Sequence, residues 1–290
     1  MTKRKLQLLA LSLCSVLALG SLAACNANEN HASDLPTNNE STLPELNPPI
    51  QAPMPEPEPP TEAPMPEVKP APEPVVNKVK YIKIQTDGLN VRSKASTSAT
   101  VLGQVDSDVS MQYLGTVNGF YKTYYKNQIA YVSAKSSYTK LFEMEEDEGY
   151  IEDIIEEGAK LIGTLYVYGA VRYHNGKGVK LSGFTVKKFD CSSLMQYIFY
   201  MGNGTLLQVN TRTQIYQGES VQKSQLKRGD LMFFTNDSRR NKTGVERVGH
   251  VALYLGDNLI LHTASDYCKI EQISAKRWKD FLEAKRMPKA

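Results

Sequence analysis

Residues able to carry nucleophilic or metal chemistry are scarce in this sequence. Only four cysteines and four histidines occur among 290 residues. None of them falls in the Cys-x-x-Cys or His-Glu-x-x-His spacing of common zinc sites. Signatures of nucleic-acid binding, such as an RNP motif, a zinc finger or a leucine zipper, are missing as well. We therefore expect no metal, no other cofactor and no nucleic-acid partner.

Proline is almost absent after residue 77. Fourteen of the fifteen prolines lie before it, in a segment with repeats such as "PMPEPEPPTEAPMPE" and no apolar periodicity. Because proline fixes φ and glutamates repel one another, residues 25–77 predict a semi-rigid tether and not a domain. Net charge divides at the same point, with −5 over residues 1–77 and +8 over residues 78–290. A cationic folded part suits anionic polymers such as acidic wall polymers or lipid.

A long membrane-spanning run is also missing. The apolar stretch Leu6 to Leu19 is short and interrupted by polar residues, and it follows the basic Lys3-Arg4-Lys5. This pattern indicates a secretory signal. Its end, "LAAC", resembles a bacterial lipoprotein signal, in which cleavage precedes a cysteine that is then lipidated. The resemblance implies a signal peptide over residues 1–24, lipidation of Cys25 and an extracytoplasmic protein anchored to the cell membrane. Plain secretory cleavage after Ala24 is the alternative.

Closely spaced β-rich runs fill residues 81–141. Turn signals separate them, at Asp87-Gly88, Asn118-Gly119 and Asn127-Gln128. This pattern predicts a small barrel. The runs "DGLNVRSKASTSATVLGQV" and "NGFYKTYYKNQIAYVS" resemble the bacterial SH3-like domains of wall enzymes, although Phe120 and Ala130-Tyr131 replace the usual tryptophan and Gly-Trp. The resemblance implies an all-β SH3-like barrel over residues 78–141, either a ligand-binding module or a spacer.

An acidic run, Glu143 to Glu157, follows with nine acids and no base. Its start predicts a solvated linker. Near Tyr150 apolar residues begin to recur at helical spacing, which predicts a helix through Ile151, Ile154 and Ile155. We interpret the acids as a solvated helix face and not as a metal site.

A cysteine lies at the start of the next helical pattern, "VKKFDCSSLMQYIFYMG". Leu194, Tyr197 and Ile198 recur at spacings of three and four, and Cys191 belongs to the same face. Asp190 is a suitable N-cap. A thiol at a helix N-terminus is biased toward thiolate, which favours a nucleophile over a small buried hydrophobe.

Two histidines lie on neighbouring predicted strands, "VGHVALYL" and "NLILHTA". If Gly256-Asp257-Asn258 form a three-residue turn, His250 and His262 project from the same side of a hairpin, as opposite or diagonal neighbours. A nucleophilic cysteine needs a base, and the base needs an orienting group. Cys191, His250 and His262 satisfy these needs in order. We also expect a strand at "LKRGDLMFF" and a closing helix at "SAKRWKDFLEAKR", which gives an α+β arrangement.

The motifs "FDCSSL", "RGDLMFF", "VGHVALYLGDN" and "ILHTAS" resemble the NlpC-type cysteine peptidases, papain-like enzymes that cut bacterial wall stem peptides. The resemblance covers residues 149–290 and implies that Cys191 is the nucleophile, His250 the base and His262 the orienting residue. "LYVYGA" is similar to the family's Tyr-x-aromatic-Gly-Gly element, which implies a place for Tyr166 near the oxyanion hole. In two-domain relatives the residues matching Asp190 and Ser192 help to hold the free amine of the substrate's L-alanine.

The resemblance has two departures and one unusual insertion. Ser193 and Ala170 stand where the family has glycines. The connection over residues 170–189 is long and basic, with no acid before Asp190. It is either a solvated loop or a flap that attracts substrate carboxylates.

Three other readings stay open. A zinc site could combine Cys191, His250, His262 and Cys268, although we expect Cys268 to be inert packing. The chain could instead be a non-catalytic wall-binding lipoprotein, or a papain-like amidase or acyltransferase acting on another amide. Our prediction is a monomeric, lipid-anchored cysteine endopeptidase acting on peptidoglycan stem peptides, most specifically on the bond between γ-D-glutamate and meso-diaminopimelate.

Overall fold

The computed structural model describes residues 54–56 and 77–290. The predicted signal peptide, Cys25 and nearly all of the proline-rich segment lie outside the described residues. No helix in the described part of the chain is long and apolar enough to cross a membrane.

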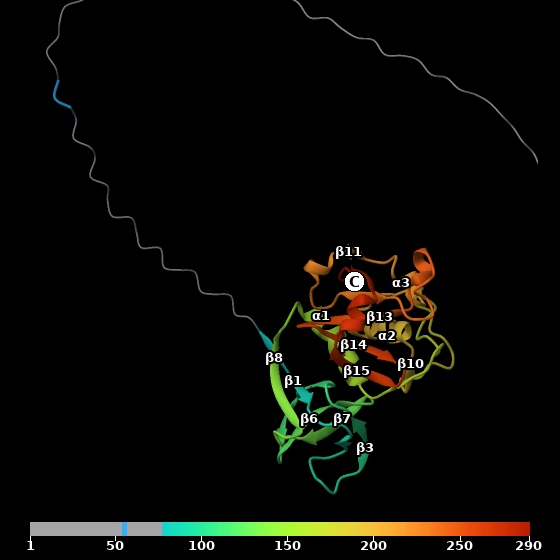
Figure 1. Cartoon of the computed structure of the whole chain (residues 1–290). Helices are drawn as coiled ribbons and strands as arrows, with labels where there is room; N and C mark the ends of the chain where they lie inside the picture. The colour runs from blue at the N-terminus through green and yellow to red at the C-terminus, as the bar shows by residue number, and fades with distance from the viewer. Residues whose placement is uncertain (1–53, 57–76) are drawn as a thin grey trace, which may run out of the picture. The chain divides into compact units, whose positions relative to one another are not determined.

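Eight short strands come first (Figure 1). They are β1 (Lys78–Ile84), β2 (Leu89–Arg92), β3 (Val101–Val105), β4 (Ser110–Gln112), β5 (Gly115–Val117), β6 (Phe120–Tyr125), β7 (Gln128–Ser133) and β8 (Thr139–Glu145). Five of them form one sheet in the order β3-β2-β7-β6-β5, and β4, β1 and β8 pair beside it. Val91, Val105 and Val132 are buried in the core. The predicted all-β module is confirmed.

The residue types in the turns explain why these strands are separated by only two residues at two places in the chain. Asn118 and Gly119 have φ values of 47° and 77° in the β5–β6 turn. Residues of this kind tolerate positive φ, as tight hairpins require. The next turn is centred on Lys126 and Asn127, with φ of 52° and 61°. The turn predicted at Asn127-Gln128 was therefore one residue late, because Gln128 already pairs with Tyr125 in the ladder.

The second domain consists of helices and a mainly antiparallel sheet. Its helices are α1 (Gly149–Lys160), α2 (Cys191–Asn203), α3 (Thr211–Gln214) and α4 (Ala275–Lys279). Its strands are β9 (Leu165–Tyr166), β10 (Lys188–Phe189), β11 (Glu219–Val221), β12 (Leu231–Phe234), β13 (His250–Gly256), β14 (Leu259–Ala264), β15 (Tyr267–Gln272) and β16 (Phe281–Arg286). The strand order is β11-β16-β12-β13-β14-β15, and α2 packs against β13 and β14. The α+β prediction is confirmed.

Helix α1 has the predicted amphipathic pattern. Ile151, Ile154 and Ile155 are buried, and the helix packs against α2. One acid of the run is not solvated, however. Both carboxylate oxygens of Glu152 accept hydrogen bonds from Arg228, at 2.6 and 2.8 Å.

The predicted closing helix was wrong over most of its length. Only Ala275–Lys279 is helical, and Asp280 is its C-cap. The following "FLEAKR" is strand β16, which pairs with β12 and β11. The local sequence favours a helix, but pairing with the fully buried strand β12 overrides a weak intrinsic preference.

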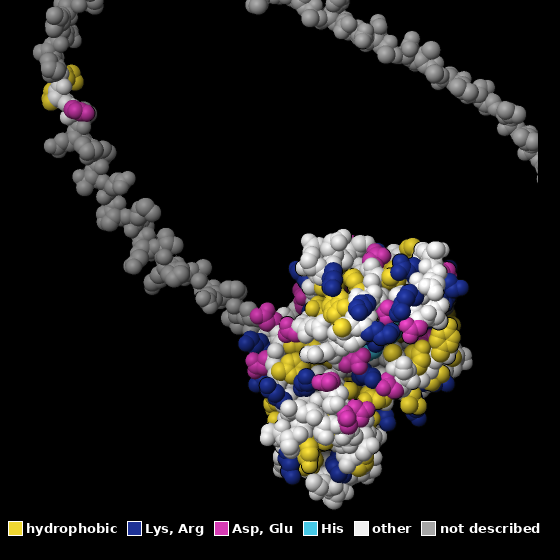
Figure 2. Space-filling model, viewed as in Figure 1, with side chains coloured by type: hydrophobic (Ala, Val, Ile, Leu, Met, Phe, Trp, Pro, Cys, Tyr) yellow, Lys and Arg dark blue, Asp and Glu magenta, His cyan; other side chains and the backbone are white. Residues whose placement is uncertain are grey.

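The two domains share backbone and side-chain contacts. The β4 strand pairs with β15 at Ser110 and Ile270, so that one sheet continues from the second domain into β4, β1 and β8. Arg228, which is 8% exposed, also donates to the Tyr81 hydroxyl at 2.8 Å. Figure 2 shows acidic and basic side chains mixed on the face that it presents.

Candidate active site

Cys191 is the first residue of α2, where the sequence builds a closed N-cap. The Asp190 carboxylate accepts from the Ser193 backbone N–H at 2.8 Å, and the Ser193 hydroxyl accepts from the Asp190 N–H at 2.9 Å. This capping box satisfies two backbone donors reciprocally. Ser193, which stands where the family has glycine, therefore fixes the turn that presents the thiol. Cys191 is 8% exposed.

The two histidines lie on the β13–β14 hairpin. Its turn is Asp257 and Asn258, with φ of 47° and 62°, and not the predicted three residues. A bulge between Tyr254 and Gly256 offsets the shorter turn. Without that bulge, a one-residue change of register would send the histidines to opposite faces. With it, they are the predicted diagonal neighbours.

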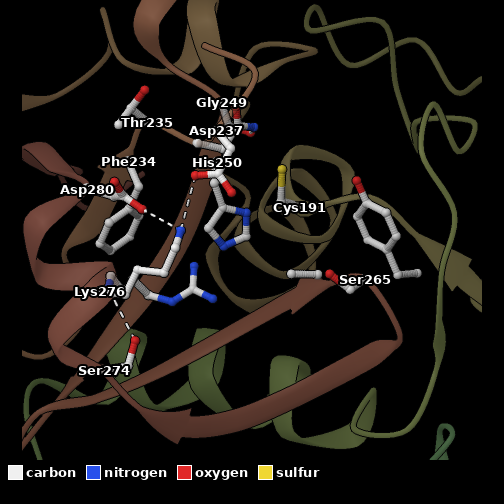
Figure 3. Close-up of a pocket in the computed structure, with 14 residues that line it drawn as sticks. Cys191, Phe234, Thr235, Asp237, Gly249, His250, Ser265, Ser274, Lys276 and Asp280 are labelled. Atoms are coloured by element: carbon white, nitrogen blue, oxygen red, sulfur yellow. Dashed lines mark hydrogen bonds and ion pairs between the residues drawn. The ribbon is translucent and has the colours of Figure 1, made fainter. Parts of the chain in front are cut away.

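A chain of hydrogen bonds runs through both rings. Nε2 of His250 lies 3.0 Å from Nδ1 of His262, and Nε2 of His262 lies 2.9 Å from Oε1 of Glu271. A carboxylate only accepts, so His262 carries its proton on Nε2 and accepts at Nδ1. His250 then carries its proton on Nε2, which leaves Nδ1 as an unprotonated base. Figure 3 shows the His250 ring beside Cys191.

Sequence reasoning missed Glu271. The register of β14 and β15 pairs His262 with Lys269, which places Glu271 on the same face of the sheet, two residues along. The alternation in "YCKIEQI" places Lys269 and Glu271 on one face of a strand. Only the pairing of β15 with β14 shows that His262 lies on the same face. Arg277 lies 3.6 Å from the same carboxylate.

Burial shifts the pKa values of the thiol and of its base in the directions that favour their neutral forms. Burial, followed by the negative charge of Asp190, raises the pKa of Cys191 to about 11. Hydrogen bonds from the backbone N–H groups of Val251 and Ser192 act in the opposite sense but do not prevail. Burial, with help from His262, holds the pKa of His250 well below its usual range. These shifts oppose the thiolate that the helix N-terminus favours, because burial raises the pKa of Cys191 more than the backbone donors lower it.

Two pockets meet at Cys191. We call one, of about 340 Å³, the histidine pocket; it is lined among others by Phe234, His250, Ser265, Lys276 and Arg277. The other, of about 430 Å³, we call the arginine pocket; it is lined among others by Tyr168, Arg172, Asp190, Ser192, Arg212 and Arg239. Tyr166, Cys191, Asn236 and Gly249 line both. The thiol therefore lies where an extended substrate would pass from one pocket to the other.

Tyr166 lies where sequence reasoning expected it, next to the thiol. Strand β9 pairs in parallel with β10, which places Tyr166 opposite Phe189 just before the helix. Burial, followed by the proximity of Cys191 and Asp190, raises the pKa of its phenol. The hydroxyl therefore stays protonated and able to donate a hydrogen bond near the reacting sulfur.

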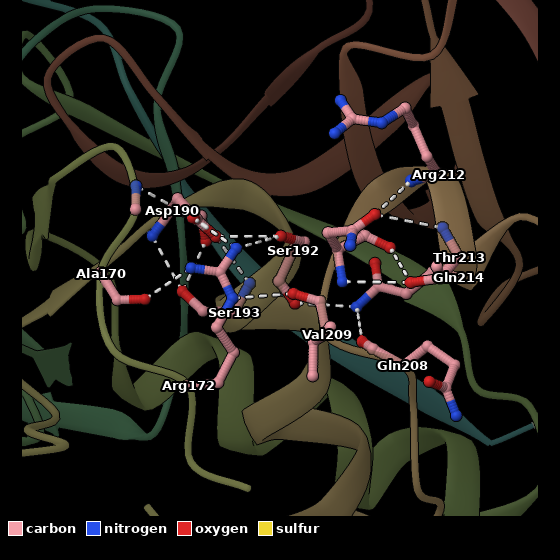
Figure 4. A network of polar contacts seen from close by, with 12 residues as sticks. Ala170, Arg172, Asp190, Ser192, Ser193, Gln208, Val209, Arg212, Thr213 and Gln214 are labelled. Carbon is pink, nitrogen blue, oxygen red and sulfur yellow. Dashed lines mark hydrogen bonds and ion pairs between the residues drawn. The ribbon is translucent and has the colours of Figure 1, made fainter. Parts of the chain in front are cut away.

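Asp190 and Ser192 also lie beside Cys191, but their polar atoms are engaged (Figure 4). Arg172, from the basic 170–189 connection, lies 2.8 Å from the Asp190 carboxylate and 3.1 Å from the Ser192 hydroxyl. This part of the connection is therefore not a solvated loop. The sequence contained one sign of this contact: the basic 170–189 connection has no acid of its own, and Asp190 is the first acid that follows it.

The zinc ligand set is not assembled. Cys268 pairs with Thr263 in the β14–β15 ladder, so its side chain is on the sheet face opposite to that of His262. It is fully buried with a free thiol. Among residues 54–56 and 77–290, no three histidine, cysteine or acidic side chains gather in a way that could hold a metal ion.

Two family models match parts of this chain. Residues 163–287 match the model of the NlpC/P60 family, and residues 87–140 match that of the bacterial SH3 domain. The chain is 35% identical over 120 residues to the murein DD-endopeptidase MepS/murein LD-carboxypeptidase of Escherichia coli, covering 40% of this chain and 60% of that protein. It is 32% identical over 126 residues to a γ-D-glutamyl-L-lysine dipeptidyl-peptidase of Bacillus subtilis, covering 43% of this chain and 36% of that protein.

A solved structure of an NlpC/P60 family protein from Bacillus cereus is 19% identical, with a TM-score of 0.39, and the match covers 72% of this chain and 64% of that one. The chain thus spans less than two thirds of the length of each of these three proteins. Its own domains are nevertheless clear: residues 163–287 form a domain of the NlpC/P60 family, preceded by a bacterial SH3 domain at residues 87–140.

Proposed function

We propose that this protein is a cysteine endopeptidase that hydrolyses peptidoglycan stem peptides, at the bond between γ-D-glutamate and meso-diaminopimelate. One observation carries the proposal. His250, His262 and Glu271 form a hydrogen-bonded chain, and Cys191, which lines a pocket together with His250, also lines the second pocket. The names of the relatives, an endopeptidase of murein and a γ-D-glutamyl-L-lysine dipeptidyl-peptidase, support the substrate class.

The proposed reaction starts from a neutral Cys191 thiol and a neutral His250 imidazole. The Cys191 sulfur attacks the γ-carbonyl carbon while Nδ1 of His250 takes the thiol proton, so that the charge separation forms only during attack. His262 accepts the Nε2–H of the resulting imidazolium, and Glu271 supplies the counter-charge behind it. In this proposal the backbone N–H of Cys191 and the Tyr166 hydroxyl stabilise the oxyanion of the tetrahedral intermediate.

In the rest of the cycle His250 acts first as an acid and then again as a base. As the C–N bond breaks, His250 gives its proton to the leaving amine, and a thioester between Cys191 and the γ-glutamyl group remains. Water then attacks the thioester with His250 as base. This step releases the carboxylic acid and restores the thiol, so the enzyme consumes one water for each amide bond cleaved.

The location is part of the proposal. We propose that the mature chain begins at a lipidated Cys25 and that residues 25–77 hold the folded domains away from the membrane, facing the wall. The net positive charge of residues 78–290 supports a partner of opposite charge such as the wall. We propose that the protein acts as a monomer.

Defined muropeptides test the reaction. Purified protein is incubated with L-Ala-γ-D-Glu-meso-diaminopimelate-D-Ala, and the products are identified by mass. We expect L-Ala-D-Glu and a diaminopimelate-containing fragment from the wild type and from Cys268→Ala, and neither from Cys191→Ala. The absence of any product would favour a non-catalytic wall-binding protein, and cleavage elsewhere would reassign the bond. Loss of activity after chelation would indicate a metal-dependent enzyme.

A further inference from the structure

We infer that this site accepts stem peptides whose L-alanine nitrogen is acylated, as in peptides still joined to the wall, because Arg172 already occupies the carboxylate that a free amine would need. This inference rests on the proposed function, in which the arginine pocket receives the N-terminal end of the stem peptide. It concerns which substrates are used and not which bond is cut.

The Asp190 carboxylate has no acceptor capacity left. One oxygen accepts from the Ser193 N–H at 2.8 Å and from the Ser192 hydroxyl at 3.0 Å. The other accepts from the Gly169 N–H at 3.2 Å and from the Arg172 guanidinium at 2.8 Å. Two carboxylate oxygens offer about four lone-pair sites, and four donors fill them here. A substrate ammonium could bind only by displacing one of these donors.

The Ser192 hydroxyl is equally committed. It donates its proton to Asp190 and accepts from Arg172 at 3.1 Å. A hydroxyl has one proton to donate, and here that proton is used inside the protein. The pair of side chains that would recognise an amine is thus an internal network in which the arginine supplies the positive charge.

Arg172 cannot easily leave this position. Its Nε donates to the Val209 carbonyl at 2.7 Å, and one terminal nitrogen donates to the Ala170 carbonyl at 2.6 Å. Its side chain is 19% exposed, and that of Asp190 is 6% exposed. Figure 4 shows the guanidinium held between these groups. Removing it from a nearly buried carboxylate would leave an unpaired charge behind.

The rest of the arginine pocket also disfavours an ammonium. Arg212 and Arg239 line it together with Arg172, and both share one partner, Glu246, at 3.3 and 3.0 Å. An incoming cation therefore meets three guanidinium groups, whose two carboxylate partners, Asp190 and Glu246, are already paired with them. An amide nitrogen carries no charge, so the acylated peptide avoids this repulsion.

The first domain does not restrict this end of the cleft. All described residues that line the two pockets belong to the segment from Tyr166 to Asp280. Residues 77–145 therefore contribute no side chain to the lining of either pocket.

Three substrates test the inference. The kcat/KM values are measured for L-Ala-γ-D-Glu-meso-diaminopimelate, for its N-acetyl form and for the same peptide joined to muramic acid. We expect the three values to agree within about threefold for the wild type, whereas an amine-selective site discriminates about tenfold to a hundredfold. A wild-type preference of tenfold or more for the free amine would overturn the inference.

Variants locate the cause. Arg172→Met keeps an unbranched apolar stem but removes the guanidinium from Asp190 and Ser192, so we expect a preference of about tenfold for the free amine to appear. Arg172→Lys retains a positive charge on Asp190 and should show no such preference. Lys187→Met is the matched control, because this exposed lysine belongs to the same basic connection but lines neither pocket, and it should keep the wild-type ratio. If Arg172→Met folds and still treats the three substrates alike, Arg172 is not the determinant and the inference fails.

A binding measurement separates this inference from the proposed function. The affinities of Cys191→Ala for the same three peptides are measured by calorimetry. If the wild type cuts none of them, the proposed function is wrong. The inference then stands only if the three peptides bind Cys191→Ala with similar affinity, and it falls if the free amine binds tenfold more tightly.

Discussion

The Glu271 carboxylate lies 2.9 Å from Nε2 of His262 on the neighbouring strand, and through His262 it determines which nitrogen of His250 carries the proton. Glu271→Gln removes the charge that fixes this tautomer while keeping the shape. We expect kcat to fall about tenfold to a hundredfold with KM nearly unchanged. Steady-state kinetics on a stem peptide provide the measurement.

The control for this variant is Glu219→Gln, which removes an exposed acid on β11. It should retain wild-type kcat and melting temperature. If Glu271→Gln instead raises KM or merely lowers the melting temperature, Glu271 has a structural role and does not position the histidines.

The two histidines should differ in how much they matter. His250→Ala removes the base and should reduce kcat/KM nearly as much as Cys191→Ala, because the pair acts as a unit. His262→Asn should retain part of the activity, since an amide oxygen can still accept the Nε2–H of His250. A fully inactive His262→Asn beside an active His250→Asn would exchange the two roles.

The pH dependence of alkylation tests the neutral thiol. Burial raises the pKa of Cys191 to about 11, so its thiolate fraction should grow about tenfold for each pH unit up to that value. We expect the rate of iodoacetamide labelling, followed by mass spectrometry, to rise steadily between pH 7 and pH 10. A rate that is constant from pH 6 to pH 8 would indicate a resting thiolate–imidazolium pair.

Cys268 provides the internal comparison. It is 0% exposed, and burial also raises its pKa above the usual range. It should be labelled only after Cys191, and Cys268→Ser should leave the pH profile of Cys191 labelling unchanged. Earlier labelling of Cys268 would show that the cleft around Cys191 is closed to the reagent.

The Arg228 side chain should contribute strongly to stability. Arg228→Met leaves the mostly buried Glu152 carboxylate without its bidentate partner and the Tyr81 hydroxyl without its donor. Loss of one member of such a pair costs about 3 kcal/mol of unfolding free energy. Thermal unfolding should show a melting temperature lower by roughly 6–12 °C.

A surface arginine supplies the contrast. Arg212 pairs with the exposed Glu246 at 3.3 Å, so Arg212→Met should change the unfolding free energy by less than about 1 kcal/mol. Equal losses for the two variants would mean that the Arg228 contacts contribute nothing beyond an ordinary surface pair.

Sequence patterns predicted the parts of the site that depend on local order. Asp190 as N-cap, Cys191 on the first turn and the shared face of His250 and His262 all follow from spacings of a few residues. Glu271 and Arg172 could not be predicted in this way. The first depends on which strand pairs with β14, and the second depends on where a long connection folds back, so both are set by contacts distant in sequence.

The same distinction explains the errors in the fold. Phe281–Arg286 has helical composition but is a strand because β12 and β11 offer unpaired edges. The turn at Asp257 and Asn258 is shorter than expected. A bulge restores the register, and no pattern in the local sequence predicts that bulge.

The sheet that continues from β15 into β4 has a consequence for protein engineering. Only residues 146–148 separate β8 from α1, and the Tyr81 hydroxyl and the Ser110 backbone lie in contact with the second domain. A chimera that replaces residues 78–145 with another wall-binding module would expose the β15 edge and leave Arg228 without one partner. Such grafts would succeed only with modules that reproduce a tyrosine on the first strand and a pairing edge at the fourth.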